Sequence, residues 1–195
     1  MNFMLMPLLL AAALLQGPAA KPRATTANPA PAAARSAAPI VWSAARPLTV
    51  ADFHSRPNPS ERLAALTSTN IKAGAACRDF VFSGTVEATF EPSASWVRSP
   101  ATMPAALLRH EHTHFDLTEV HARRLRQKLV AFQARANCEK LQPAFDNVTK
   151  PLYTEWDRDQ NRYDQETNHG LNVVRQAEWE KQTQIRLEQL KAFAQ

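Results

Sequence analysis

Hydrophobic and polar residues alternate most regularly between Asp79 and Phe90. One face of this segment is apolar, and the other carries mainly hydroxyl groups and a carboxylate. A period of two is typical of a strand that is buried on one side. We therefore predict a strand over Asp79–Phe90 and weaker strands over Ala64–Lys72 and Ser95–Arg98. Gly84 interrupts the apolar face, which predicts a bulge there. That face comprises Phe80, Phe82, Val86, Ala88 and Phe90.

The pattern changes to helical spacing after residue 100. Apolar residues recur every seven positions, and a second row beside them completes one stripe along a helix. This predicts a long helix from about Thr102 to Asn137, with Pro104 in the first turn, where proline is tolerated. Two further helices are predicted over Pro151–Glu166 and Leu171–Phe193. The stripe comprises Leu108, Phe115, Ala122, Leu129 and Ala136, flanked by Thr118, Leu125 and Phe132.

This order of strands and helices predicts an α+β fold. We expect a small antiparallel sheet in the N-terminal half, packed on the long helix and on the two C-terminal helices.

The first 39 residues differ in composition from the rest of the chain. Residues 3–15 are apolar apart from one proline and precede small residues, a pattern that resembles a secretory signal peptide. This run is too short for a comfortable membrane span. Residues 21–39 are rich in Ala and Pro and contain few large apolar groups. We therefore predict a signal peptide over 1–20, a disordered linker over 21–39 and one domain over 40–195, exported to the periplasm or the cell exterior.

Charge and cysteine content narrow the functional classes. The formal charge of the 195-residue chain is +5, and basic residues are mixed with acidic ones along the later helices. Such mixing favours solubility, and no nucleic-acid-binding motif is present. Cys77 and Cys138 lack the CxxC spacing of metal or redox motifs, so we expect them to pair in an oxidising compartment. A disulfide closing a loop of that length would stabilise the fold by about 4 kcal/mol.

The candidate chemistry lies in the long predicted helix. His110, Glu111 and His114 fit the pattern H-E-x-x-H. Residues four apart share one face of a helix, so the two imidazoles can bind one Zn²⁺. Glu111 would stand beside the metal and act as general base toward the attacking water. His112 points to the opposite side, and His121 lies too far along the helix to share the ion.

The third zinc ligand must come from another segment, and residues 163–170, YDQETNHG, contain the candidates. His169 precedes Gly170, where the chain can turn into a site, and is the preferred ligand. Asp164 and Glu166 are the carboxylate alternatives.

Supporting roles are also predicted around the metal. Tyr163 could donate a hydrogen bond to the developing oxyanion. Asp116 or Glu119 could orient a ligand imidazole. The strand over residues 79–90 is expected to bind an extended peptide by edge pairing.

Two segments carry a family resemblance. The run LLRHEHTHFDLTEVHARRLR, with YDQETNHG downstream, resembles the bacterial family catalogued as domain of unknown function 922, described as predicted secreted zinc-dependent proteases. The stretches WSAARPLTVADF and ALTSTNIKAG also resemble that family, so the likeness spans roughly residues 40–195. The resemblance implies a zinc peptidase. The residues that it supports or draws attention to are His110, Glu111, His114, Tyr163, Asp164 and His169.

These features predict an exported, zincin-like metallopeptidase that uses Zn²⁺ and acts on a peptide or protein, such as a component of the cell envelope. The alternative is a non-enzymatic envelope protein with a structural zinc, in which His54, His121 or a carboxylate supplies a fourth protein ligand. A third possibility is a metal-free binding module whose histidines respond to pH. An open coordination position would favour catalysis over a structural role.

Overall fold

A long hairpin forms the main sheet. The computed structural model describes residues 37–133 and 137–195, so the predicted signal peptide and almost all of the predicted linker lie outside the described residues. Strands β3 (Thr69–Arg78) and β4 (Val81–Phe90) pair antiparallel along their whole length. Strand β1 (Ile40–Val41) pairs with the end of β4, which gives the order β1-β4-β3. A second antiparallel sheet consists of β2 (Ala65–Leu66) and β5 (Trp96–Val97).

The turn between β3 and β4 corrects the predicted start of the central strand. Asp79 and Phe80 form a two-residue turn, and both have positive φ angles, 52° and 62°. This is the backbone conformation of a type I′ hairpin turn, which usually contains Gly or Asn. The sequence has neither Gly nor Asn at these two positions, so the predicted strand over Asp79–Phe90 begins two residues too early. Phe80 lies in the turn and is 88% exposed, although it was predicted on the apolar face. The rest of the predicted apolar face is buried.

The weaker predicted strand over Ala64–Lys72 divides into two elements. β2 covers its beginning, and β3 continues beyond it to Arg78. Small residues dominate the second half of β3 and gave no alternation signal. The predicted bulge at Gly84 is also wrong, because Gly84 pairs in regular register with Ala75. A Cβ atom at Gly84 would lie 3.0 Å from Leu129, so this glycine allows β4 to approach the long helix.

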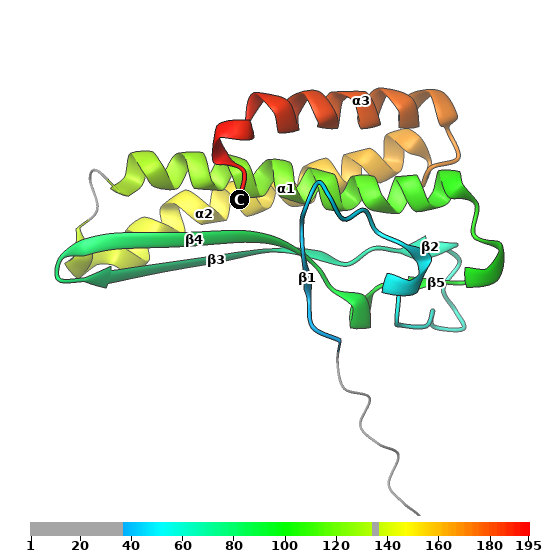
Figure 1. The fold of residues 1–195 in the computed structure, drawn as a ribbon, viewed down its shortest axis with the longest axis horizontal. Coiled ribbons are helices and arrows are strands. Elements are labelled where there is room, and N and C mark those ends of the chain that lie inside the picture. Colours follow the sequence, from blue (N-terminus) through cyan, green and yellow to red (C-terminus); the bar gives the residue numbers. More distant parts are fainter. Residues whose placement is uncertain (1–36, 134–136) are drawn as a thin grey trace, which may run out of the picture. The chain divides into compact units, whose positions relative to one another are not determined.

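Three helices lie on one side of the hairpin. They are α1 (Ala105–Gln133), α2 (Leu141–Thr167) and α3 (Val173–Gln189). In Figure 1, α1 and α2 lie next to the hairpin, and α3 packs on their other side. The predicted α+β fold is thus confirmed. Short 3-10 helices connect or end these elements at Val50–Asp52, Pro92–Ala94, Pro100–Thr102, Cys138–Lys140 and Lys191–Phe193.

Helix α2 begins at Leu141 and not at the predicted Pro151. Pro151 lies inside the helix, where proline normally costs several kcal/mol because it removes a backbone hydrogen bond. Phe145, Thr149 and Leu152 are buried on both sides of it. Packing of this face against the rest of the core therefore offsets the poor helical propensity of the proline.

The main hydrophobic core lies between the sheet and helices α1 and α2, with Phe90, Phe115 and Leu125 among its buried residues. A smaller core of Leu117, Tyr163 and Trp179 joins the three helices. Helix α1 is therefore buried on two faces, which leaves little of its central part in contact with solvent.

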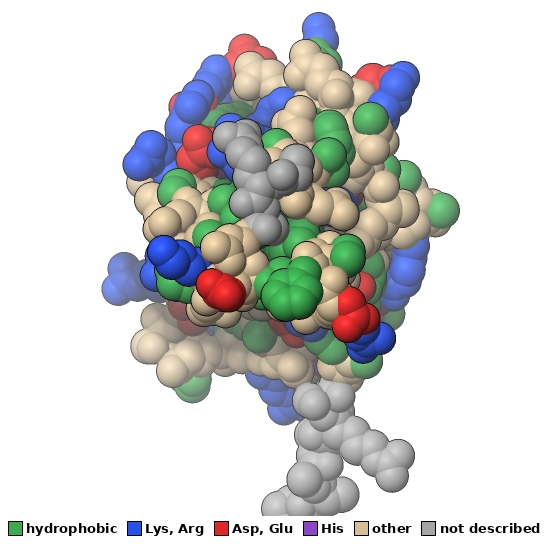
Figure 2. Space-filling view, turned by 90° about the vertical axis from the view of Figure 1, so that its left-hand side faces the viewer, with side chains coloured by type: hydrophobic (Ala, Val, Ile, Leu, Met, Phe, Trp, Pro, Cys, Tyr) green, Lys and Arg blue, Asp and Glu red, His purple; other side chains and the backbone are tan. Residues whose placement is uncertain are grey.

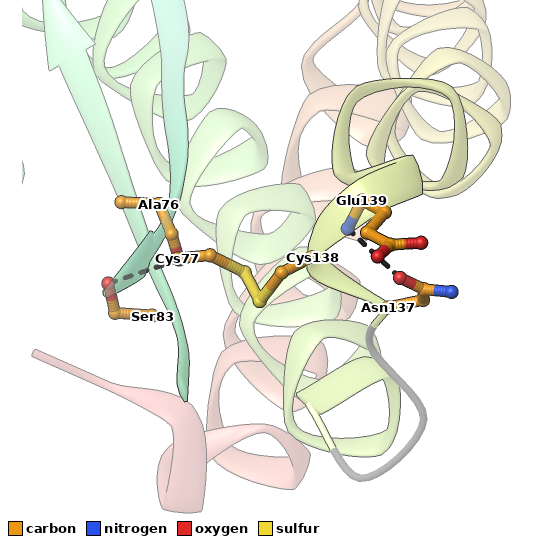
Figure 3. The surroundings of a disulfide bond; sticks show 6 residues. All are labelled: Ala76, Cys77, Ser83, Asn137, Cys138 and Glu139. Atoms are coloured by element: carbon orange, nitrogen blue, oxygen red, sulfur yellow. Dashed lines mark hydrogen bonds between the residues drawn. A yellow bond between two sulfur atoms is a disulfide. The ribbon is translucent and has the colours of Figure 1, made fainter. Parts of the chain in front are cut away.

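A disulfide ties the hairpin to the helical layer. Cys77 near the end of β3 and Cys138 before α2 are bonded, as predicted, across a sequence separation of 61 residues (Figure 3). Asn137 stabilises the adjoining backbone by accepting a hydrogen bond from the Glu139 N–H. The bond joins β3 to the segment before α2, although β4, β5 and α1 lie between them in the sequence.

The end of the molecule that carries the β3–β4 turn displays hydrophobic side chains among charged ones (Figure 2). Phe80 and Val81 are exposed in this region. Across residues 37–133 and 137–195, no helix combines the length and apolar character that a membrane span requires.

Candidate metal centre

His110 and His114 lie one turn apart on α1, and their side chains are only 2% and 11% exposed. The Nε2 atoms of both rings face one oxygen of Asp164 on α2, Oδ1, at 3.1 and 3.0 Å. In the described part of the chain, these three residues form the group whose possible metal-binding atoms lie within 4.8 Å of one another. The structure therefore brings together the two predicted histidines and the first carboxylate alternative.

The donor atoms of this group suit a zinc ion. Each Nε2 atom either donates a hydrogen bond to Asp164 or, when it carries no hydrogen, presents a lone pair that can bind a cation together with the carboxylate oxygen. Tetrahedral zinc with bonds of 2.0–2.1 Å places neighbouring donor atoms about 3.3 Å apart. The N–O separations of 3.0 and 3.1 Å are close to that value. The residues present fit the metal that the sequence predicts.

The charges at the centre reinforce one another. Burial would raise the pKa of Asp164, but hydrogen bonds from His110 and His114 hold it well below its usual range. Burial would also lower the pKa of His114, and the Asp164 carboxylate outweighs this effect and raises it. Asp164 is thus a carboxylate, available as an anionic ligand, over the ordinary pH range.

Two glutamines contact the other nitrogen of each ring. Oε1 of Gln176 on α3 lies 3.1 Å from Nδ1 of His110. Oε1 of Gln160 on α2 lies 2.7 Å from Nδ1 of His114. Sequence reasoning missed both residues, because no local pattern marks a glutamine that contacts a histidine from another helix.

The acidic residues predicted to orient the imidazoles have other partners, so that prediction is wrong. Asp116 accepts hydrogen bonds from the Trp42 indole and the Gln184 amide. Glu119 forms ion pairs with Arg123 and Arg126.

Tyr163 lies beneath the histidines and outside the pocket lining. Its ring stacks on His110 at a centroid distance of 4.7 Å, and its hydroxyl donates to Oε1 of Gln176 at 2.9 Å. The side chain is fully buried, and burial raises the pKa of its hydroxyl. The geometry supports a role in holding His110, in place of the predicted contact with a substrate oxyanion.

A pocket of about 600 Å³ opens above the centre. His110, Glu111, His114 and Asp164 contribute to its lining, as do the segment 62–67 around β2 and the turn 168–171. Glu111 is buried, and its carboxylate has no hydrogen-bond partner among residues 37–133 and 137–195, which leaves it available to a bound molecule. The predicted peptide-binding strand, residues 79–90, is absent from the lining, and β2 occupies that place.

Among residues 37–133 and 137–195, no strand pairs with the edge of β2 that faces away from β5. The Arg98 N–H donates a hydrogen bond to the Ala64 carbonyl. The backbone N–H and C=O groups of Ala64 and Leu66 therefore point toward β5. Because hydrogen-bonding directions alternate in antiparallel strands, those of Ala65 and Thr67 point to the opposite edge. The structure therefore offers a short free strand edge in the segment that lines the pocket.

The turn after α2 places His169 at the rim of the pocket. Asn168, His169 and Gly170 all have positive φ angles, at 51°, 53° and 81°. Non-glycine residues in this region store strain, which often accompanies functional sites. Nδ1 of His169 lies 3.4 Å from Oδ1 of Asp164, but His169 is half-exposed and lies outside the three-residue group. A Cβ atom at residue 170 would lie 3.0 Å from the His110 side chain, so the close approach requires glycine.

The remaining candidate ligands lie elsewhere. Glu166 binds Arg162, Arg175 and the Trp179 indole, outside the pocket. His112 contacts the backbone N–H of Leu48, on the opposite side of α1 as predicted.

Neither histidine considered as a fourth ligand reaches the centre. His54 is exposed and contacts the Ala51 carbonyl. His121 is fully buried and contacts Asp159.

A comparison with known protein families finds a match. The model of a family described as "Bacterial protein of unknown function (DUF922)" matches residues 54–170, which is more than half of the chain. No curated protein and no solved structure matches the chain. The matched range includes His110, Glu111, His114 and Asp164, and it ends at the turn that contacts His110.

Proposed function

The chain belongs to the DUF922 family of bacterial proteins, and from this premise we propose that it is an exported, zinc-dependent peptidase. The observation that carries the proposal is the convergence of His110 Nε2, His114 Nε2 and Asp164 Oδ1 in the lining of a pocket that also contains Glu111. Two histidines and one carboxylate form the ligand set of a hydrolytic zinc site, and a glutamate beside the first histidine is the usual general base.

His110, His114 and Asp164 would hold the ion. Zinc bound there supplies Lewis acidity, which lowers the pKa of a coordinated water to about 7 and polarises the scissile carbonyl. The histidines contribute no net charge when neutral, so Asp164 supplies the single negative charge of the ligand set.

Glu111 would transfer the proton in the reaction. Its carboxylate accepts a proton from the attacking water as the water oxygen bonds to the carbonyl carbon. It then donates that proton to the amide nitrogen as the C–N bond breaks. The Glu111 carboxylate in the pocket suits both steps, because no residue of the described chain forms a hydrogen bond with it.

An extended peptide suits the pocket better than a compact small molecule. The free peptide groups of Ala65 and Thr67 can pair with a substrate backbone, as in other complexes formed by strand addition. The nearby walls are largely apolar and include Leu63, Leu66 and Leu107. We therefore expect preference for apolar side chains next to the cleaved bond.

Export is supported by the disulfide between Cys77 and Cys138. Disulfides persist mainly in oxidising compartments such as the periplasm and the cell exterior. The apolar N-terminal segment of the sequence points in the same direction.

A structural zinc is the second candidate function, and one observation favours it. Nδ1 of His169 lies 3.4 Å from Oδ1 of Asp164, so a fourth protein donor is close to the centre. Four protein ligands would close the coordination shell and leave no position for water. The position of His169 outside the three-residue group favours the peptidase instead.

Hydrolysis by the zinc-loaded wild type separates these two functions, and replacement of Glu111 by Gln tests the mechanism. The purified protein should cleave peptides in a mixed-sequence library, lose this activity to a zinc chelator and regain it when zinc is restored. Glu111→Gln should bind zinc as the wild type does but lose about 10²–10⁴-fold in kcat/KM, the usual contribution of an acid–base group. Retained turnover in this variant would remove Glu111 from the mechanism, and a zinc-loaded wild type without hydrolysis would favour the structural role.

A further inference from the structure

We propose that Gln160 and Gln176 are positioning residues that fix the tautomers of the two metal-binding histidines. The inference rests on the proposed zinc site and adds the two groups that aim its imidazoles. Each glutamine comes from a different helix, α2 or α3, and each contacts the Nδ1 atom of one histidine on α1. The crossing of the three helices would thereby determine which ring nitrogen faces the ion.

The glutamine oxygens determine where the imidazole hydrogens lie. An amide oxygen accepts hydrogen bonds and cannot donate them. Nδ1 of His110 and Nδ1 of His114 must therefore carry the hydrogens that Gln176 and Gln160 accept. In a neutral ring, this leaves the lone pair on Nε2, so a bound ion would take the place of the hydrogen bonds between the Nε2 atoms and Asp164 Oδ1.

The Gln160 amide is locked in this orientation. Its nitrogen donates to the His114 carbonyl at 3.0 Å and to the Thr118 hydroxyl at 3.0 Å. Rotation of the amide by 180° would place its oxygen against the carbonyl oxygen of His114, and that hydrogen bond would be lost. The oxygen must therefore face the ring.

The Gln176 amide is locked by different partners. Its nitrogen donates to Glu180 Oε1 at 2.8 Å, and its oxygen also accepts from the Tyr163 hydroxyl at 2.9 Å. Gln176 is buried. An inverted amide would place its nitrogen against the Tyr163 hydroxyl and its oxygen against the Glu180 carboxylate.

Glutamine also fixes the charge of the centre. Histidines bound to zinc often donate to a carboxylate, which makes the ring a stronger base. A neutral amide orients the ring without adding a negative charge. With neutral histidines and one aspartate, a divalent ion keeps a net positive charge toward the pocket.

The test combines zinc affinity with a spectroscopic signature of each ring. Gln160→Leu and Gln176→Leu remove the acceptors, and each should weaken zinc binding about 10–100-fold, measured by competition with a chromophoric chelator. In the zinc-loaded wild type with ¹⁵N-labelled histidine, both Nδ1–H protons should give signals protected from exchange. Gln160→Leu should remove the protection of His114 alone, and Gln176→Leu that of His110 alone.

Gln184→Leu is the matched control. Gln184 also lies on α3 and bonds a residue of α1, Asp116, but it does not contact either histidine. This variant should keep wild-type zinc affinity and both signals. Gln176→Met, which is close in size to glutamine, replaces Gln176→Leu if that variant does not fold.

The outcomes separate the inference from the proposed function. If the wild type binds zinc and the Gln160 and Gln176 variants bind it equally tightly with unchanged signals, the positioning role is wrong and the zinc site stands. If the wild type does not bind zinc, both are wrong. A loss of affinity in all three variants, including Gln184→Leu, would indicate general destabilisation and also overturn the positioning role.

Discussion

Asp164 faces two imidazoles across the contact between α1 and α2. Its side chain is 31% exposed, so it lies between the buried histidines and the pocket. His169 is five residues further along, beyond the left-handed residue that ends α2. The backbone N–H of His169 donates to the Asp164 carbonyl, which ties the turn to the same helical end. Asp164 therefore combines a helical position with direct access to both Nε2 atoms, whereas His169 is placed at the rim.

Substitutions of these two residues should affect zinc binding very differently. Asp164→Asn removes the anionic ligand and should weaken zinc binding by more than 10–100-fold. A loss of 10–100-fold is typical when only a residue that contacts a metal ligand is replaced. His169→Gln changes a half-exposed side chain and should alter zinc affinity by no more than about twofold, the effect of a typical surface substitution. Competition with a chelator measures both affinities. A severe loss in His169→Gln with little change in Asp164→Asn would assign the third ligand to His169.

The three helices meet again at a partly buried polar cluster away from the pocket. His121 on α1 lies 2.9 Å from Asp159 on α2, and Arg186 on α3 bonds the same carboxylate at 2.8 Å. Burial, and then the nearby Arg186 charge, lower the pKa of His121 despite the opposing effect of Asp159. Its Nδ1 atom has no hydrogen-bond partner in the described part of the chain. The neutral form of His121 is therefore favoured in the folded protein.

This cluster predicts a loss of stability in mild acid. A histidine with a lowered pKa in the folded state contributes stability above its unfolded pKa of about 6.5, and the contribution is lost as pH falls through the folded pKa. His121→Gln cannot take up the proton. Between pH of about 7 and 5, the free energy of unfolding of the wild type should fall by up to about 1.4 kcal/mol per pH unit more than that of the variant. Urea unfolding at several pH values measures this difference, and parallel pH profiles would exclude a role for His121.

At the scale of the whole molecule, the pocket and the disulfide lie in different regions. In Figure 1, β2 and β5 lie near the start of α1, and the β3–β4 turn lies near its other end. The pocket lies among β2, the first half of α1 and the end of α2. The disulfide joins β3 to the start of α2. Loss of the disulfide should therefore lower the free energy of unfolding and leave the geometry of the pocket largely unchanged.

Features that depend on local spacing could be predicted from the sequence. The α+β class, the long helix and the shared helical face of His110 and His114 follow from periodicity within one segment. The third donor and the two glutamines come from α2 and α3, so their positions depend on how the helices cross. The free edge near Ala65 likewise depends on pairing with β5, and short strands give weak patterns.

The zinc ion itself provides the most direct test of the account. A crystal structure of the zinc-loaded protein, with anomalous diffraction measured at the zinc absorption edge, would locate it. The account predicts one ion bound by His110 Nε2, His114 Nε2 and a carboxylate oxygen of Asp164, with a remaining position open to the pocket and to Glu111. No ion at this place, or a shell closed by four protein ligands, would contradict it.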